Sequence, residues 1–364
     1  MKFRKLRQAI KQNKFLFFMY TKLTSIDYRQ AYKEYLRSNF KSEEIVSKEI
    51  SLLKEYWKCD PMHYFRYRLF AKKILKEDLL DYIPPYYFYN IHMKNLYEDK
   101  EISNFNSKIY LNQFFKIKEI KTPKVISVIK KGKIYSCYGE ILTFEELVED
   151  INKSLVSNFF LKPDLGSGGA GIILIQKEGS KLIVNGNYLT RDYFNRIVGS
   201  NDFILQEGIK QREDISNINA SSVNTLRVIT QFDGINFHIP VAVMRIGRNK
   251  AFVDNSSQGG ISVNINLISG ELAEFGYVEH GNEVFDRHPD SNFVFKDFKI
   301  KDWDDIKNSI EFYARKVYEL SEFAWDISIV DSGISVIEIN TYYGIDHLQC
   351  CSGGLRRKLG IHAN

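Results

Sequence analysis

Glycine is missing from the first 131 residues of this 364-residue sequence, and the whole chain contains only seven prolines. A long stretch without glycine is typical of helices with short connections, because tight turns usually need glycine. Aromatic residues recur at helical spacing in this stretch (Tyr28, Tyr32, Tyr35) until Pro84-Pro85 interrupts the pattern. We therefore expect a mainly helical region over residues 1–100, and no catalytic constellation within it.

Cysteine is also scarce, with four residues in the chain (Cys59, Cys137, Cys350 and Cys351). None of them forms a C-x-x-C pair or a Cys/His spacing typical of metal sites, and the seven histidines are scattered. Adjacent cysteines are poor disulfide partners, so we expect reduced thiols and a cytoplasmic setting. No apolar run approaches the ~20 residues of a membrane-spanning helix.

Acidic residues are absent from residues 1–26, which hold seven Lys/Arg around the short run Phe15–Tyr20. A signal peptide needs a longer apolar core and a small-residue cleavage site. Two interpretations stay open: a basic amphipathic helix on an anionic membrane face, or an ordinary helix that packs its aromatic residues on the domain. In the chain as a whole, 51 Lys+Arg against 45 Asp+Glu give a net charge of +6. This mild, dispersed excess suits small anionic ligands, and we expect no nucleic-acid partner.

Beyond residue 101 the sequence alternates between strand-like and helical patterns. Residues 125–137 read as a hairpin, 144–155 as a helix capped at Thr143, and 303–324 as a long helix with a buried stripe. Two arginines, Arg227 and Arg245, lie in apolar strands joined by an Asp-Gly turn, so they are placed to share an anion.

A glycine-rich run, Gly166-Ser167-Gly168-Gly169-Ala170-Gly171, lies between two apolar strand-like segments. The run matches G-x-G-x-x-G, but a β-branched strand follows it instead of a helix, and no Gly-Lys-Ser/Thr is present. These facts argue against dinucleotide-binding and Walker loops. We expect a loop between two strands whose N–H groups fold over phosphates, with Lys162 adding charge; a plain flexible hairpin is the other interpretation.

The segment from Ala324 to Asn340 alternates apolar and polar residues on both sides of Asp331-Ser332-Gly333, which predicts a hairpin with a three-residue loop. If Val330 pairs with Ile334, Asp326 lies opposite Glu338, and Asn340 projects on the same face. Facing carboxylates repel unless something neutralises them, and Mg²⁺ accepts Asp, Glu and Asn oxygens. A solvated polar face on an edge hairpin is the alternative.

In this order, the motifs resemble the ATP-grasp ligases: a helix-opening Ser-Lys, Thr-Pro, strand Lys-Pro, the glycine loop, Gln-Glu-x-Ile, arginine-bearing strands, a long helix and an Asp…Glu-x-Asn hairpin. The blocks SSVNTLRVIT and VAVMRIGRNKAFVDNSSQGGI look most like the sugar-transfer-associated branch. The resemblance covers about residues 102–348. It implies an α+β ATP-grasp fold in which two subdomains, 101–205 and 206–364, grip ATP. The helical region 1–100 precedes them in the sequence.

The resemblance also implies roles for individual residues. Lys162, Arg227 and Arg245 would be catalytic, stabilising the γ-phosphate and an acylphosphate. Mg²⁺ would be held by Asp326, Glu338 and Asn340. The ATP contacts would be Lys108, Lys162, Gly166, Ser167, Gly168, Gly169, Gln206, Glu207, Ile209, Asn255 and, at the ribose, Glu213 or Asp214.

The implied reaction joins a carboxylate to an amine at the expense of ATP, in cytoplasmic assembly of a surface polysaccharide. Its substrates would be a carboxylate and an amine, either small molecules or glycan precursors. No nucleophilic side chain is needed, in keeping with the lack of a Ser/His/Asp or Cys/His signature. A kinase on the same scaffold and a non-catalytic ATP-binding accessory protein of a glycan assembly complex are the alternatives.

Overall fold

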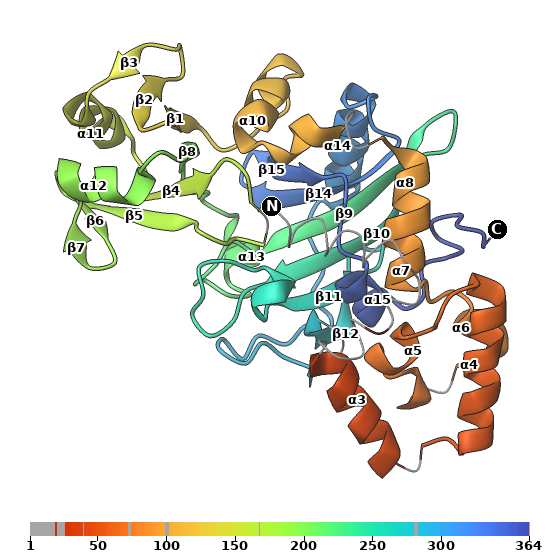
Figure 1. Ribbon diagram of the computed structural model, residues 1–364. Helices are drawn as coiled ribbons and strands as arrows, with labels where there is room; N and C mark the ends of the chain where they lie inside the picture. Colours follow the sequence, from red (N-terminus) through yellow and green to blue (C-terminus); the bar gives the residue numbers. More distant parts are fainter. Residues whose placement is uncertain are drawn as a thin grey trace.

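The computed structural model describes residues 19, 26–38, 40–71, 74–98, 102–166, 168–279 and 283–363. Two antiparallel sheets dominate it, and a helical region stands beside the second (Figure 1). Among the described residues, no helix has the length and apolarity needed to cross a membrane.

The first sheet has eight strands in the order β3-β2-β1-β8-β4-β5-β6-β7. Helices α11 and α12 pack on it, and α11 begins with the expected cap at Thr143, completed by Glu146 in a capping box. The elements are β1 (Val125–Lys130), β2 (Lys133–Ser136), β3 (Ile141–Leu142), α11 (Phe144–Lys153), β4 (Asn158–Pro163), β5 (Ile173–Glu178), β6 (Lys181–Val184), β7 (Asn187–Tyr188), α12 (Arg191–Val198) and β8 (Phe203–Glu207). The predicted hairpin at 125–137 and the glycine loop between two strands are both confirmed.

The second sheet has seven strands in the order β13-β12-β11-β10-β9-β14-β15. Its elements are α13 (Glu213–Ser216), β9 (Thr225–Phe232), β10 (Phe237–Ile246), η4 (Ser256–Gln258), β11 (Ile261–Ile265), β12 (Leu272–Tyr277), β13 (Val284–Phe285), α14 (Trp303–Lys316), β14 (Glu322–Val330), β15 (Gly333–Asn340) and α15 (Asp346–Ser352). The predicted helix over 303–324 is therefore too long. Helix α14 ends at Lys316, and β14 begins at Glu322, although the apolar stripe continues through buried Val317 and Leu320.

The N-terminal region is mainly helical, as expected. It comprises α3 (Ile26–Arg37), α4 (Glu43–Trp57), α5 (His63–Arg66), η1 (Leu69–Ala71), α6 (Lys76–Leu79), α7 (Pro85–Tyr87), the π-helix η2 (Phe88–His92) and α8 (Met93–Leu96), followed by η3 (Ser103–Asn106) and α10 (Lys108–Ile117). Most of residues 1–26, where membrane contact was considered, lie outside the described residues. Cys59 and Cys350 are buried, Cys351 is half-buried and Cys137 is exposed.

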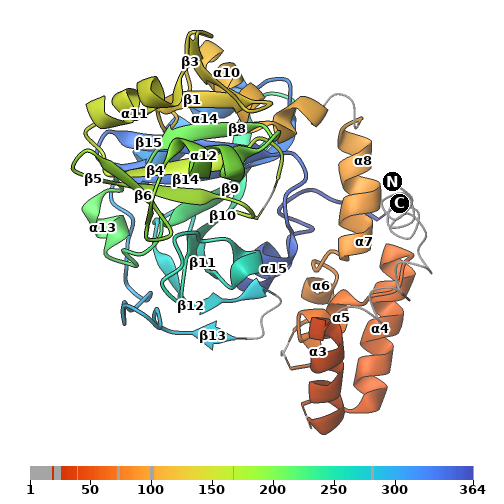
Figure 2. The same cartoon turned by 60° about the vertical axis from the view of Figure 1, so that its left-hand side comes forward.

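The two faces of the second sheet are covered by different elements. On one face Leu226, Val228 and Trp325 belong to the core under α10 and α14. On the other face Ile229 and Ala324 belong to a core formed with the N-terminal helices and α15. Figure 2 shows the N-terminal helices standing along one side of this sheet, away from the first sheet.

Buried polar contacts fasten the N-terminal region to the second sheet. His92 Nε2 lies 2.9 Å from Glu322 Oε1, and the Tyr97 hydroxyl donates to the Glu322 carbonyl (2.8 Å). The Tyr67 hydroxyl donates to Asp346 Oδ1 (2.7 Å) at the start of α15. Because buried polar groups need partners, these bonds fix the orientation of the region in addition to its apolar packing. The ranges expected for the two subdomains, 101–205 and 206–364, stay predictions.

Candidate functional site

A cavity lies between the two sheets, where α10, β4, β8 and the glycine loop face β9, β10, β14 and β15. The sequence-predicted residues that line it are Lys108, Lys162, Gly166, Gly168, Gly169, Gln206, Glu207, Ile209, Arg245, Asn255, Asp326 and Glu338. Folding therefore brings together groups that are more than 200 positions apart in the sequence.

Four predicted residues are not among those lining this cavity. Asn340 lies beside it, and Arg227 is buried behind Asp326. Asp214 accepts two hydrogen bonds from Arg212, at 2.7 and 2.9 Å. Neither Asp214 nor Glu213 thus stands where a ligand in this cavity would meet it, and Ser167 lies outside the described residues.

The predicted pairing of Asp326 with Glu338 is confirmed, although its premise is wrong. Val330 pairs with Gly333, not with Ile334, which by itself would shift the register by one residue. A β-bulge at Ile337 adds the missing residue to β15 and restores Asp326 opposite Glu338. Asn340 Nδ2 lies 3.2 Å from Glu338 Oε1 and 3.4 Å from Asp326 Oδ2, on the same face as expected.

Two arginines neutralise one member of the carboxylate pair. Arg227 donates from Nε and Nη2 to the two oxygens of Asp326 (2.6 and 3.0 Å), and Arg245 Nη2 lies 3.2 Å from Asp326 Oδ2. The anion that the two arginines share is thus the Asp326 carboxylate. Burial opposes ionisation of Asp326, but Arg227 and Arg245 outweigh it and hold its pKa at about 2. Burial and the Asp326 charge raise the pKa of Glu338.

The donor set at this place fits a magnesium ion. Asp326 and Glu338 supply two carboxylates, and the described residues contain no larger His/Cys/Asp/Glu cluster that could hold a metal. Mg²⁺ commonly uses one or two carboxylates and takes its other oxygens from phosphates and water. Asn340 would turn its Oδ1 to the ion by an amide flip, since its Nδ2 now donates to both carboxylates.

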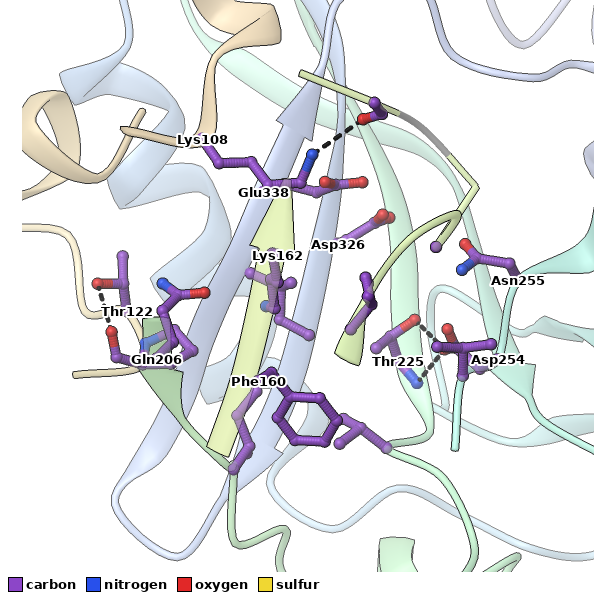
Figure 3. A pocket seen from close by; sticks show the side chains of 18 of the residues that line it. Lys108, Thr122, Phe160, Lys162, Gln206, Thr225, Asp254, Asn255, Asp326 and Glu338 are labelled. Carbon is purple, nitrogen blue, oxygen red and sulfur yellow. Dashed lines mark hydrogen bonds between the residues drawn. The ribbon is translucent and has the colours of Figure 1, made fainter. Parts of the chain in front are cut away.

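Two lysines bring positive charge to the same wall of the cavity. Lys162 on β4 lies in the middle of the site, and Lys108 at the start of α10 lies beside Glu338 (Figure 3). Burial lowers the pKa of Lys162 to about 8, although Glu338 opposes this shift. Asp164 positions Lys108, because its Oδ1 accepts from Ser107 Oγ (2.7 Å) and from the next backbone N–H, that of Ile109 (2.9 Å).

The glycine loop closes on a segment of the other subdomain. Gln258 Nε2 donates to the Gly168 carbonyl, and Lys108 Nζ donates to the Gly166 carbonyl (2.9 Å). Gly169 has a φ of 74°, and a Cβ at this position would lie 2.6 Å from Asn255 Nδ2. Only glycine therefore permits this close approach without strain. Asn255 touches the loop itself, which gives its predicted place in the site a structural basis.

The end of the cavity opposite the charged groups is apolar. Phe160 of β4 and Phe252, whose ring centroids are 6.3 Å apart, line it near Gln206 of β8. Figure 3 shows Phe160 at the other end of the site from Lys108 and Glu338. One end thus suits a flat ring and the other an anion. Phe160 and Phe252 were not predicted from the sequence, because an aromatic residue in a strand or loop usually signals core packing.

A buried Thr225–Asp254 pair was also missed. Thr225 donates to the Asp254 carboxylate through its backbone N–H (3.0 Å) and its hydroxyl. Arg245 donates from Nη2 to Thr225 Oγ1 (2.8 Å) and lies 3.5 Å from Asp254. Asp254 and Thr225 therefore hold Arg245 at Nη2, the same atom that lies 3.2 Å from Asp326 Oδ2. The only signal for this in the sequence is that Asp254 directly precedes Asn255.

Comparison with known proteins adds one strong match. Residues 88–360, about three quarters of the chain, match the family described as sugar-transfer associated ATP-grasp. No curated protein matches the sequence. The region expected from the sequence motifs alone, 102–348, lies within the matched range.

Several solved structures are similar at low identity. D-alanine–D-alanine ligase from Bacillus anthracis aligns over 72% of this chain and 65% of its own (13% identity, TM-score 0.39). D-Ala:D-Ser ligase from Enterococcus faecalis aligns over 72% and 62% (12%, 0.40), and biotin carboxylase from Campylobacter jejuni over 72% and 46% (10%, 0.42). The chain thus spans less than two thirds of each of these structures, and scores this low do not establish a shared activity.

Proposed function

The chain belongs to the sugar-transfer associated ATP-grasp family and has the ATP-grasp fold, and from this premise we propose that it is an ATP-dependent carboxylate–amine ligase. One observation supports this proposal most. A single cavity between two antiparallel sheets has an apolar end at Phe160 and a charged end where Lys162, Lys108 and Arg245 meet the carboxylates of Asp326 and Glu338. This polarity fits a nucleotide whose base lies at one end and whose phosphates lie at the other.

Each residue would have a defined task. Lys108 and Lys162 bind phosphate oxygens, and the glycine loop covers them with backbone N–H groups. Asp326, Glu338 and Asn340 hold Mg²⁺, which when bound screens the negative charge of the phosphates. Arg245, held by Thr225 and Asp254, adds positive charge beside the carboxylate of Asp326. Arg227 donates hydrogen bonds to both carboxylate oxygens of Asp326, so its task is to orient that carboxylate.

The chemistry needs positioned charge more than a reactive side chain. A carboxylate does not accept an amine directly, so its oxygen first takes up the γ-phosphoryl group, giving an acylphosphate and ADP. The amine then attacks the acyl carbon, forming the amide and releasing phosphate. Protein groups accelerate such transfers mainly by orientation and electrostatic stabilisation.

For the substrates we propose a sugar acid or amino-acid unit of a surface polysaccharide precursor, made on the cytoplasmic side of the membrane. The sugar-transfer association in the family description supports this choice.

The test is to incubate the protein with Mg-ATP, a panel of uronic acids and a panel of amino acids, and to identify the nucleotide product. We expect ADP and phosphate, formed only when acid and amine are both present. AMP and pyrophosphate would refute the acylphosphate route. ADP formed with a hydroxyl-bearing substrate and no amine would indicate a kinase, and Mg-ATP binding without turnover on any substrate would indicate an accessory protein.

The matched variant is Glu338→Gln, which keeps the size of the side chain but removes its charge. We expect it to abolish turnover. The free energy of unfolding should stay the same or rise, because the Asp326 carboxylate loses a repelling neighbour. Undiminished turnover in this variant would overturn the metal assignment.

A further inference from the structure

Helix α3 carries two exposed stripes of side chains, one apolar and one basic. Its buried side chains are Tyr28 and Ala31, which face α5, where the ring of Tyr28 lies 5.9 Å from that of Phe65. Next to this buried face lie Tyr32, Leu36 and, just beyond the helix, Phe40, which are 40%, 62% and 62% exposed. Their spacing of four residues places Tyr32 and Leu36 in one row along the helix, with Phe40 continuing it.

A basic stripe flanks this apolar one. Arg29, Lys33 and Arg37 are also four residues apart, and all three are exposed. The only acid of α3 whose side chain is described is Glu34, and Arg68 Nε binds it at 2.7 Å. The basic stripe therefore keeps its excess charge. Lys33, Arg37 and Phe40 also line a shallow hollow on this surface.

The sequence on the N-terminal side of α3 has the same chemistry. Residues 1–25 contain seven Lys/Arg and no acid, together with Phe15, Phe17, Phe18 and Tyr20. In both views α3 lies at the end of the molecule remote from the first sheet, so a large partner on α3 would leave the nucleotide cavity accessible (Figures 1 and 2).

We propose that the exposed face of α3, defined by Arg29, Tyr32, Lys33, Leu36, Arg37 and Phe40, is a binding surface for an anionic lipid bilayer. Exposed apolar side chains beside basic ones are the pattern of helices that lie in the membrane interface. The basic residues contribute electrostatic attraction to anionic headgroups, and Leu36 and Phe40 contribute apolar insertion. This proposal does not depend on the ligase reaction, and it would hold equally for an accessory protein.

The test is cosedimentation of the full chain with vesicles of phosphatidylcholine alone or mixed with phosphatidylglycerol. We expect binding to the anionic vesicles only, and weaker binding as salt is raised. The variant Lys33→Gln/Arg37→Gln should weaken it by roughly 30-fold, since each basic residue near an anionic surface contributes about 1 kcal/mol. The matched control is Lys130→Gln/Lys133→Gln, a pair of exposed lysines on β1 and β2 with the same change in charge; its binding should match that of the unmodified chain.

A second variant, Leu36→Ser/Phe40→Ser, separates the apolar part. We expect it to remove the binding that persists at high salt, because insertion of apolar side chains is not screened by ions. Far-UV circular dichroism checks that both variants stay folded.

Three results would overturn the proposal. The first is no binding to anionic vesicles, or equal binding to neutral ones. The second is anionic binding that Lys33→Gln/Arg37→Gln leaves intact and only deletion of residues 1–25 removes, which would assign the contact to that segment alone. The third is concentration-dependent dimerisation that Leu36→Ser/Phe40→Ser abolishes in a chain that binds no vesicles, which would make a second copy the occupant.

Discussion

Arg227→Met would show whether this arginine supports the fold of the site. Its side chain is 7% exposed, and its guanidinium donates two hydrogen bonds to Asp326, at 2.6 and 3.0 Å. Methionine keeps much of the apolar stem but leaves a buried carboxylate without its main partner. The change therefore tests the buried ion pair with little change in packing volume.

The magnitude follows from these contacts. Hydrogen bonds to charged groups contribute about 1.5–3 kcal/mol each, and breaking a buried ion pair costs about 3–5 kcal/mol. Arg245 still lies 3.2 Å from Asp326 and neutralises part of the charge of this buried carboxylate. We therefore expect the lower end, a loss of about 3 kcal/mol in the free energy of unfolding.

Urea unfolding followed by tryptophan fluorescence is the suitable assay. All three tryptophans (Trp57, Trp303, Trp325) are buried in the two cores that flank the second sheet, so their emission reports on the subdomain that holds Arg227. The matched control is Arg191→Met, which breaks an exposed pair with Glu145 and should change stability little. If Arg227→Met unfolds within about 1 kcal/mol of the unmodified chain at an unchanged m-value, the carboxylate is not held by this arginine.

Three other predictions address the loop, a lysine and a helix cap. Gly169→Ala should weaken ADP binding in calorimetry at least tenfold, because its methyl group would meet Asn255, whereas Gly179→Ala, with a positive φ but open space around it, should not. The ADP dissociation constant should be flat below about pH 8 and rise above it, because Lys162 then takes up a proton on binding; Lys162→Arg should remove this rise, and a flat profile in the unmodified chain would refute the lowered pKa. Thr190→Ala removes the hydroxyl that caps α12 and should cost about 1 kcal/mol in urea unfolding, whereas Thr190→Ser should cost much less.

Local patterns in the sequence were sufficient for many elements of the fold. The capping box at Thr143 and the strands on both sides of the glycine loop depend on neighbouring residues, so the chain encodes them locally. The predicted helix over 303–324 failed at its end for a related reason. Val317 and Leu320 continue the helical spacing while serving as core residues of a turn, and periodicity alone cannot distinguish the two cases.

The pairing of Asp326 with Glu338 shows how a correct result can come from a wrong step. The alternation predicted a hairpin, two facing carboxylates and a three-residue loop, but Val330 pairs with Gly333 and the loop is shorter than predicted. A bulge at Ile337 offsets the shorter connection, and bulges have no dependable signal in a single sequence. The bulge restores the pairing of Asp326 with Glu338, and the alternation of apolar and polar residues does not predict this bulge.

By itself, the sequence determined which chemical groups this protein brings to its site: the glycine loop, Lys108 and Lys162 as cations, and the Asp326–Glu338–Asn340 set. Only the tertiary structure decided how these groups are used. It turned Arg227 to Asp326 and away from the cavity, placed Asp254 and Thr225 behind Arg245, and brought Asn255 against Gly169. Arg227 meets Asp326 because β9 and β14 are neighbours in the second sheet, although 99 positions separate the two residues in the sequence. Asn255 meets Gly169 because the two sheets pack together, whereas spacing along a sequence records only what neighbours do.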